Sequence, residues 1–216
     1  KDCIPNVVEN MGLLLKKGKV IWIKTAPILD ITAGLNELDH VIEIHIVSVK
    51  NEVKELLWKI SSETGKALKF IVADLEFYGK DKKVEILTDQ FIEPRSYSNP
   101  LTYIYEPSRA LMKSGKFDWI SSYFGLHKLH RHSHLFTSDN LMEFQGRAFR
   151  IEDTIAYQGS VIKKLNIKKA NISTRNFPLS VDVLRKKLKI KDGGDTYLFF
   201  TTLKDESLAI IKCSKL

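Results

Sequence analysis

The stretch Arg175-Asn176-Phe177 combines three side chains that suit nucleic-acid binding. Arginine presents a planar fork that binds a phosphate or a base edge through two hydrogen bonds. Asparagine can hydrogen-bond to a base, and phenylalanine can stack on one. Pro178 follows and opens a predicted helix, whose free N–H groups favour an anion. The pattern predicts an RNA contact, and the alternative is a core Phe177 with Arg175 paired to a carboxylate.

Histidine recurs at positions 127, 130, 132 and 134. On a strand, alternate residues share a face but lie about 6.5–7 Å apart, which strains three-histidine binding of one zinc ion. No cysteine lies nearby, so we predict no metal site. The interleaved charge instead favours an RNA-binding surface that includes His130, Arg131 and His132, with Arg147 added from a later segment. A partly buried polar strand is the alternative.

A third group follows the apolar segment 19–24, and it comprises Lys24, Pro27 and Asp30. Ligands of open α/β sheets bind beyond the carboxyl ends of the strands, which is where these residues fall. They are therefore candidates for a cofactor or substrate cleft. The alternative is a proline-containing loop with Asp30 at a helix start.

The first half must position this third group, and its apolar patterning predicts alternating helices and strands. We expect helices over 7–17, 29–38 and 52–60, strands over 19–24, 40–49 and 68–75, and a hairpin partner over 82–87. Short β-branched runs without alternation are typical of buried parallel strands. This half therefore predicts an α/β domain with a parallel sheet over residues 1–90.

The second half changes character after a predicted linker at 91–100, where Pro94, Pro100 and polar residues break the periodicity. We predict an α+β domain over 101–216. Its expected helices are 108–114, 117–123 and one opened by Pro178, and its expected strands are 135–138, 147–151, 170–175, 196–202 and 208–213. Lys204-Asp205-Glu206 should join the last two strands in a hairpin.

Composition narrows the class of protein. The chain has 216 residues, of which 44% are hydrophobic, and this excludes wholesale disorder. No apolar run approaches the roughly 18 residues of a membrane span, so we expect no membrane partner. The two cysteines, Cys3 and Cys213, lie at opposite ends of the chain, which argues against a disulfide framework. A reducing compartment, most simply the cytoplasm, is expected.

The charge is asymmetric. The whole chain carries a formal net charge of +8. Residues 101–216 hold 20 Lys and Arg against 11 Asp and Glu, a net of +9, whereas residues 1–100 hold 14 against 15, a net of −1. A concentrated positive charge favours a polyanion as partner. The sequence therefore places an RNA-binding surface in the second half.

Several strings, taken in order, resemble bacterial class I S-adenosylmethionine-dependent methyltransferases that carry a C-terminal THUMP-like domain. These strings are Lys24–Asp30 (KTAPILD), His45–Glu55 (HIVSVKNEVKE), His134–Ser138 (HLFTS), Phe144–Arg147 (FQGR), Arg175–Leu179 (RNFPL) and Leu188–Gly194 (LKIKDGG). The resemblance implies a Rossmann-like remnant in the first domain and a THUMP-like second domain. It also implies S-adenosylmethionine as cofactor and RNA, such as tRNA, as partner.

The departures from that family are specific. The family has a glycine-rich loop after its first strand and an acidic residue for the cofactor ribose, and this sequence has neither. Its Gly193-Gly194 pair lies near the end of the chain, far from any first strand. The resemblance thus implies the C-terminal part of a methyltransferase. The cofactor site would lie mostly upstream, and this part alone would be inactive.

The sequence leaves three functions open. The first is part of an RNA methyltransferase in which the second domain presents the substrate. The second is a non-catalytic RNA- or protein-binding module on an α/β scaffold, and the third is a methyltransferase for a protein or a small molecule. A truncated sheet also exposes a strand edge, which favours a homodimer.

Overall fold

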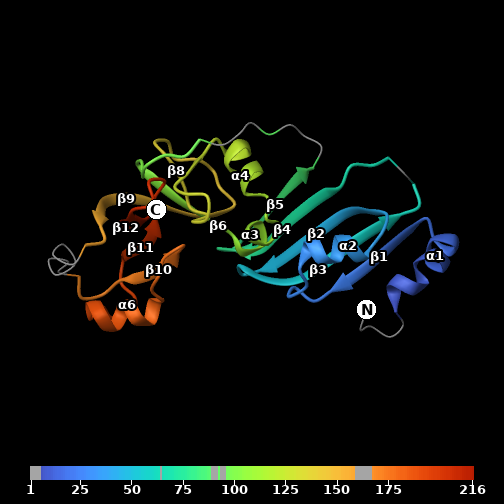
Figure 1. Ribbon diagram of the computed structural model, residues 1–216, viewed down its shortest axis with the longest axis horizontal. Helices are drawn as coiled ribbons and strands as arrows, with labels where there is room; N and C mark the ends of the chain where they lie inside the picture. The colour runs from blue at the N-terminus through green and yellow to red at the C-terminus, as the bar shows by residue number, and fades with distance from the viewer. Residues whose placement is uncertain (1–5, 64, 89–91, 93–95, 159–166) are drawn as a thin grey trace. The chain divides into compact units, whose positions relative to one another are not determined.

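The computed structural model describes residues 6–63, 65–88, 92, 96–158 and 167–216. The chain forms two compact units, each built on its own sheet (Figure 1). Unit 1 comprises Lys1–Phe91 and Ser108–Lys116, and unit 2 comprises Ile92–Pro107 and Phe117–Leu216. The segment Ser108–Lys116 lies within the range expected for the second domain but packs with the first unit.

Unit 1 contains a five-stranded sheet and three helices in the described part of the chain. The elements are α1 (Val7–Lys17), β1 (Val20–Thr25), α2 (Ile31–Glu37), β2 (Val41–Val49), β3 (Glu52–Ser61), β4 (Lys69–Phe77), β5 (Lys80–Leu87) and α3 (Arg109–Lys113). The predicted helix over 7–17 is confirmed. Asn6 caps it, since its side-chain oxygen accepts from the N–H of Val8 at 3.1 Å.

The predicted helix over 52–60 is wrong, because these residues form strand β3. Lys50 and Asn51 both adopt positive φ, at 52° and 61°, and make the tight turn that joins β2 to β3 as a hairpin. Along β3 the side chains of Leu56, Trp58 and Ile60 are buried at every second position. That period of two is the strand signal, and the acidic residues at 52 and 55 obscured it.

The predicted parallel sheet is also wrong in this unit. The strand order is β1-β3-β2-β4-β5, and only the β2–β4 pair is parallel. The hairpins β2–β3 and β4–β5 supply antiparallel neighbours, because a short turn can only return the chain antiparallel. The result is a mixed, sheet-rich α/β architecture.

The core of unit 1 lies on one face of this sheet. Trp58 is fully buried there, and its indole N–H donates to the Thr25 hydroxyl at 2.9 Å. A Cβ added at Gly34 of α2 would approach Trp58 Cζ2 to 2.8 Å, so glycine lets α2 lie directly on the indole. A larger residue at position 34 would push α2 away from the sheet.

A buried carboxylate fixes the remaining helix of unit 1. Asp74 of β4 is fully buried and accepts hydrogen bonds from the hydroxyls of Ser48 and Ser108, the latter at 2.6 Å. The Ser108 hydroxyl oxygen also accepts from the N–H of Leu111 and so caps α3. The Asn51 side chain accepts from the N–H of Arg109 at 2.8 Å. These bonds hold α3 against the sheet of unit 1.

Unit 2 contains a seven-stranded sheet with the order β10-β11-β12-β9-β6-β8-β7. Its described elements are β6 (Tyr103–Pro107), α4 (Phe117–Phe124), β7 (His127–Lys128), β8 (Phe136–Ser138), β9 (Gly146–Ala156), β10 (Asn171–Arg175), α6 (Val181–Leu188), β11 (Thr196–Thr202) and β12 (Leu208–Lys215). Among the described strands of this unit, only β10 and β11 pair in parallel, and two isolated parallel bridges, Tyr97–Lys128 and Lys169–Lys191, lie outside those pairings. The predicted hairpin at Lys204-Asp205-Glu206 is confirmed by the antiparallel pairing of β11 with β12.

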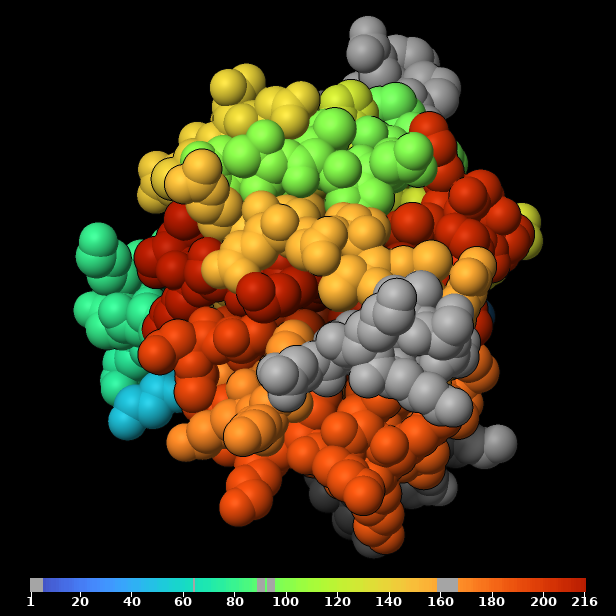
Figure 2. All heavy atoms as spheres, turned by 90° about the vertical axis from the view of Figure 1, so that its left-hand side faces the viewer, coloured from blue at the N-terminus to red at the C-terminus, as the bar shows by residue number. Residues whose placement is uncertain are grey.

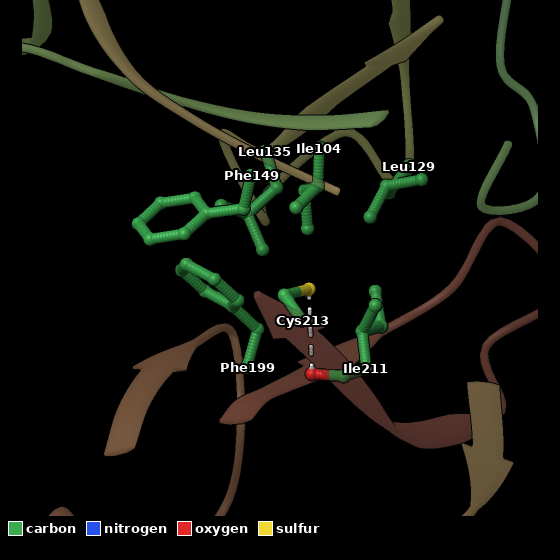
Figure 3. Close-up of a cluster of buried hydrophobic side chains, with 7 residues drawn as sticks. All are labelled: Ile104, Leu129, Leu135, Phe149, Phe199, Ile211 and Cys213. Carbon is green, nitrogen blue, oxygen red and sulfur yellow. Dashed lines mark hydrogen bonds between the residues drawn. The ribbon is translucent and has the colours of Figure 1, made fainter. Parts of the chain in front are cut away.

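The sheet of unit 2 buries one of its apolar clusters between β6, β9, β11 and β12 (Figure 3). Phe149 and Phe199 meet edge to face at 5.1 Å between ring centroids, and Ile104 and Ile211 complete the layer. Cys213 lies in the same cluster with no exposed surface. Burial raises the pKa of its thiol to about 12, so this cysteine behaves as an apolar core residue.

Cys3 lies outside the described residues, and so do residues 91 and 93–95 at the start of the predicted linker. The described part of the linker joins unit 2, because Tyr97 forms a β-bridge with Lys128 and the Ser98 N–H donates to the Lys128 carbonyl at 3.0 Å. In the part of the chain that the structure describes, no helix is both long and apolar enough to cross a membrane.

Candidate functional site

Glu106 lies at the centre of a charged cluster in unit 2. It is only 4% exposed, and Arg147 Nε donates to its Oε2 at 2.8 Å. Glu106 and Arg147 are register partners on β6 and β9. A Cβ added at Gly146 would overlap the Glu106 carbonyl oxygen, so glycine at the start of β9 permits this close approach. The register thus forces one carboxylate–guanidinium pair.

Arg175 reaches the same carboxylate from the end of β10. Its Nη2 donates to Glu106 Oε1 at 2.6 Å, and its Nη1 donates to the Thr174 carbonyl at 3.0 Å. In a flat sheet, β10 and β6 would be about 19 Å apart, four strand spacings, which no Arg–Glu pair can bridge. The sheet of unit 2 is therefore strongly curved, and the curvature brings Arg147, Arg175 and Glu106 together.

Hydrogen bonds of polar side chains hold the segment 127–134, which begins with β7, in its conformation. Lys128 is buried, and its ammonium donates to the Arg131 carbonyl at 2.9 Å and lies 5.4 Å from the centroid of Phe117. Ser133 is also buried, and it donates to the Thr202 carbonyl at 2.8 Å while accepting from the Thr201 hydroxyl. These bonds anchor the loop to β11 and leave Arg131 and His132 exposed.

His130 connects this loop to Asn176. Two donors approach its Nδ1: the N–H of His132 at 3.1 Å and the Asn176 amide nitrogen at 3.0 Å. Nδ1 must therefore be the acceptor, and Nε2 carries the proton and donates to Glu206 at 3.0 Å. This hydrogen bond lowers the pKa of the Glu206 carboxyl. The network fixes the imidazole in one orientation.

His134 lies on the inner side of the loop with φ at 52° and stacks on Phe117, with ring centroids 3.7 Å apart. Burial, with Lys128, His132 and Arg175 nearby, lowers the pKa of His134 to about 4. Among the described residues, Arg175 Nε and His134 Nδ1 are buried atoms that have no hydrogen-bond partner. The lowered pKa of His134 thus follows first from its burial and then from the positive charges of these neighbours.

The predicted RNA-binding residues separate into three groups. Arg131, His132 and Asn176 are exposed, and Asn176 bonds to the buried His130. Arg147 and Arg175 are committed to Glu106, which is the alternative raised for Arg175. Phe177 packs into an apolar cluster, 5.5 Å from Phe200 and 4.9 Å from Tyr157. Its ring is thus a half-buried core group rather than an open stacking surface.

The predicted cofactor residues lie in unit 1, Lys24 near the end of β1 and Pro27 and Asp30 in the segment that follows it. Lys24 is exposed and pairs with Glu55 at 3.6 Å. Asp30 caps α2, since its carboxylate accepts from the N–H of Ala33 at 2.9 Å, and Pro27 is half-buried in the preceding turn. Asp30 therefore has the helix-start role named as its alternative.

The loop that holds Pro27 and Asp30 does not fit S-adenosylmethionine. The loop from 26 to 30 contains no glycine, and its one carboxylate is used as a helix cap. Gly193 and Gly194 form a positive-φ turn against the Lys169 side chain, which lies 3.1 Å from a Cβ added at Gly193. No three His, Cys, Asp or Glu of the described part of the chain are grouped so that they could hold a metal ion.

A second basic surface surrounds α6 at one end of unit 2. The exposed lysines of α6 and its flanks are Lys168, Lys169, Lys186, Lys187, Lys189 and Lys191. Figure 2 shows this end of the molecule, with α6 and its flanks in orange. Ser180 caps the helix, and Lys187 donates to the Tyr157 hydroxyl at 3.1 Å. The amphipathic pattern turns Leu184 into the core and the lysines outward.

An open hollow lies next to the His130 network. It has a volume of about 510 Å³ and is lined by Tyr97, His130, Arg131, Lys204, Asp205 and Glu206. The sequence indicated His130 and Arg131 as site residues. It did not indicate Tyr97, Glu106 or the residues of the predicted hairpin turn as part of the site. Glu106 had one sequence signal: it is the acidic residue in the otherwise apolar and aromatic strand Tyr103–Pro107.

Comparison with known proteins places these features in context. Residues 146–215 match the family described as THUMP domain-like. Residues 103–144 match a family described as a ferredoxin-like domain. No curated protein matches the sequence.

One solved structure matches almost the whole chain. It is the crystal structure of a proposed methyltransferase from Porphyromonas gingivalis W83, with a TM-score of 0.90 and 33% identity. The match covers 99% of this chain and 55% of that one, so the chain spans about half of the relative's length. The chain therefore has the fold of part of a proposed methyltransferase, and its residues 146–215 are similar to THUMP-like domains.

Proposed function

We propose that the chain is the C-terminal part of an S-adenosylmethionine-dependent methyltransferase that acts on RNA, and that unit 2 binds the RNA. The observation that carries the proposal is the match over nearly the whole chain to a proposed methyltransferase, together with the THUMP-like region at 146–215. The net charge of +9 over residues 101–216 supports a polyanion as partner.

No chemical step is assigned to this chain, because the loop that holds Pro27 and Asp30 does not fit the cofactor. Unit 2 contributes by proximity: it binds the RNA and holds the acceptor atom where the activated methyl group is presented. The cofactor supplies that methyl group when it is bound. Equilibrium dialysis of this chain against labelled S-adenosylmethionine should therefore show no saturable binding.

The lysines around α6 and the exposed Arg131 are the candidate phosphate contacts. Arg147 and Arg175 are weaker candidates, because Glu106 already neutralises part of their charge. We also propose that the protein is cytoplasmic. We further propose that it forms a homodimer through the β1 or β5 edge of the sheet of unit 1. Light scattering over a wide concentration range tests the dimer, and a constant monomer mass contradicts it.

A salt titration of the chain with bulk tRNA tests RNA binding. Affinity should fall steeply with salt, because each phosphate contact releases counterions. The test variant is Lys186→Glu with Lys187→Glu, which reverses two charges in the last turn of α6. The matched control is Lys16→Glu with Lys17→Glu, the same change in the last turn of α1.

We expect the α6 variant to weaken binding and to reduce the salt slope by about 1–2, whereas the α1 variant binds as the parent does. Binding that is insensitive to salt, or equal loss in both variants, contradicts an RNA surface at α6. The non-catalytic binding module remains the second candidate, because the loop that holds Pro27 and Asp30 does not fit the cofactor. Methyl transfer to RNA by a longer chain that includes this one would exclude that candidate.

A further inference from the structure

The hollow beside His130 is an open concave site of about 510 Å³, a volume within the usual range of small-ligand sites. Its walls come from three separate segments: the residues before β6, the loop 127–134 and the β11–β12 turn. All three belong to unit 2. Because three distant segments form the hollow, its shape does not depend on the conformation of a single loop.

Each wall is held by hydrogen bonds of its own. The Lys128 ammonium bonds to the Arg131 carbonyl, and the Tyr97 segment is bridged to the Lys128 backbone. The turn closes with the Leu203 N–H donating to the Ser207 carbonyl at 2.9 Å, and Asp205 accepts from the Ser207 hydroxyl at 2.6 Å. The lining side chains are therefore preorganised by the fold.

The lining combines three kinds of group. Tyr97 presents an aromatic ring that is 43% exposed. Arg131 and Lys204 supply two cations, and Arg131 lies 3.8 Å from Glu206, longer than a hydrogen bond. Asp205 and Glu206 are carboxylates whose pKa values are lowered, Asp205 by its hydrogen bonds with Ser207 and Glu206 chiefly by the one with His130. They remain acceptors at neutral pH.

A ribonucleotide is the ligand class that uses all three. A base stacks on an exposed aromatic ring, which is worth about 1–3 kcal/mol per base and tolerates any base. A phosphate binds the arginine and the lysine. A ribose 2′-hydroxyl donates to a carboxylate, which distinguishes RNA from DNA. An isolated anion would leave the ring and the carboxylates unused.

We propose that the hollow receives a single unpaired nucleotide of RNA, with its base on Tyr97, its phosphate at Arg131 and Lys204, and its ribose toward Asp205 and Glu206. This proposal deepens the proposed function and rests on it, because it names which part of the RNA unit 2 grips. The basic surface at α6 would then bind backbone phosphates without regard to base pairing.

The test is a nuclear magnetic resonance titration of the ¹⁵N-labelled chain with adenosine 5′-monophosphate and, separately, its 2′-deoxy analogue. Amide shifts should concentrate at 96–98, 130–132 and 203–207. Tyr97→Ala should weaken the affinity about tenfold, because it removes the stacking surface. Tyr97→Phe keeps the ring and should bind within about twofold of the parent. The deoxy analogue should bind more weakly than the ribonucleotide.

The control is Tyr123→Ala, which removes another exposed tyrosine, from α4 and outside the hollow, and should leave the affinity unchanged. Shifts elsewhere, no shifts up to about 10 mM ligand, or an unaffected Tyr97→Ala variant overturn the proposal, whatever bulk tRNA does. Nucleotide binding at the hollow without salt-dependent tRNA binding leaves the hollow in place and removes the RNA surface at α6. The two failures are thus distinguishable.

Discussion

Each unit contains a buried carboxylate, and the two accept hydrogen bonds from different kinds of donor. In unit 1, Asp74 accepts from two neutral donors, the hydroxyls of Ser48 and Ser108. In unit 2, Glu106 accepts from Arg147 and Arg175, so charged donors compensate it. Asp74 fixes a helix to a sheet, whereas Glu106 gathers strands around a charged site.

This difference indicates where each unit carries its function. Hydroxyl donors stabilise a buried acid without adding charge, which suits a scaffold. Two guanidinium groups around one carboxylate leave a net positive charge beside the exposed Arg131 and His132, which suits a polyanion. The proposed scaffold role of unit 1 and the proposed binding role of unit 2 can be tested separately.

The largest effect is expected from Glu106→Gln. It removes the charge that compensates Arg147 and Arg175, and breaking a buried ion pair costs about 3 kcal/mol. Urea unfolding measures the loss, and hydrogen exchange should localise it to β6, β9 and β10. Glu143→Gln, an exposed carboxylate of the same unit, is the control and should change little. Stability equal to the parent would show that the triad contributes nothing.

Ser108→Ala tests the counterpart in unit 1. It removes a hydrogen bond to the Asp74 carboxylate and the N-cap of α3, for a combined loss of about 2 kcal/mol. The faster hydrogen exchange should be confined to α3 and its contacts with β2 and β4. Ser122→Ala, an exposed serine of α4, serves as the control. Faster exchange in unit 2 alone would contradict the assignment of α3 to unit 1.

Two glycines of unit 1 separate packing from helix propensity. Gly34→Ala should destabilise by about 1–2 kcal/mol, because the new methyl group meets the buried Trp58 ring. Gly12→Ala in α1 meets no atom within 4 Å and should stabilise by about 0.5–1 kcal/mol. Thermal unfolding measures both, and the same sign for the two changes would refute the close packing of α2.

The pH dependence of unit 2 should reveal His134. Its pKa in the folded chain, about 4, lies below the ordinary value of 6.5, so the unfolded chain takes up the proton first. His134 therefore costs no stability above pH 6.5, and stability falls as the pH drops from 6.5 towards 4. His134→Asn suits the positive φ and removes this dependence. Urea midpoints at pH 7 and pH 4.5 should differ less in the variant than in the parent.

The smallest effect is expected from Lys24→Ala. The Lys24–Glu55 pair is exposed, and such pairs contribute less than about 0.5 kcal/mol. Urea unfolding at low and at high salt should give the same difference within that limit. A loss above 1 kcal/mol would show that the surface of unit 1 is electrostatically organised, which would narrow the contrast with unit 2.

Local patterns determined several elements from the sequence alone. The amphipathic helix over 7–17 and the hairpin at Lys204–Glu206 depend on neighbours within a few residues, and both are confirmed. The helix prediction for 52–60 is wrong because acidic residues near its start are typical of a helix N-terminus. Lys50 and Asn51, with positive φ, instead turn the chain into a hairpin. The charge asymmetry between the two halves is likewise a property of the sequence.

Only the tertiary structure decided the site. Arg175 and Glu106 are 69 positions apart, and the curvature of the sheet brings their side chains together. Tyr97 and Lys204 line one hollow, although no sequence period relates them. Residue types fix which chemistry is available, but distances between remote segments depend on how the strands pair and bend. For this reason His130 and Arg131 could be predicted as site residues from the sequence, whereas their neighbours in the hollow could be identified only from the fold.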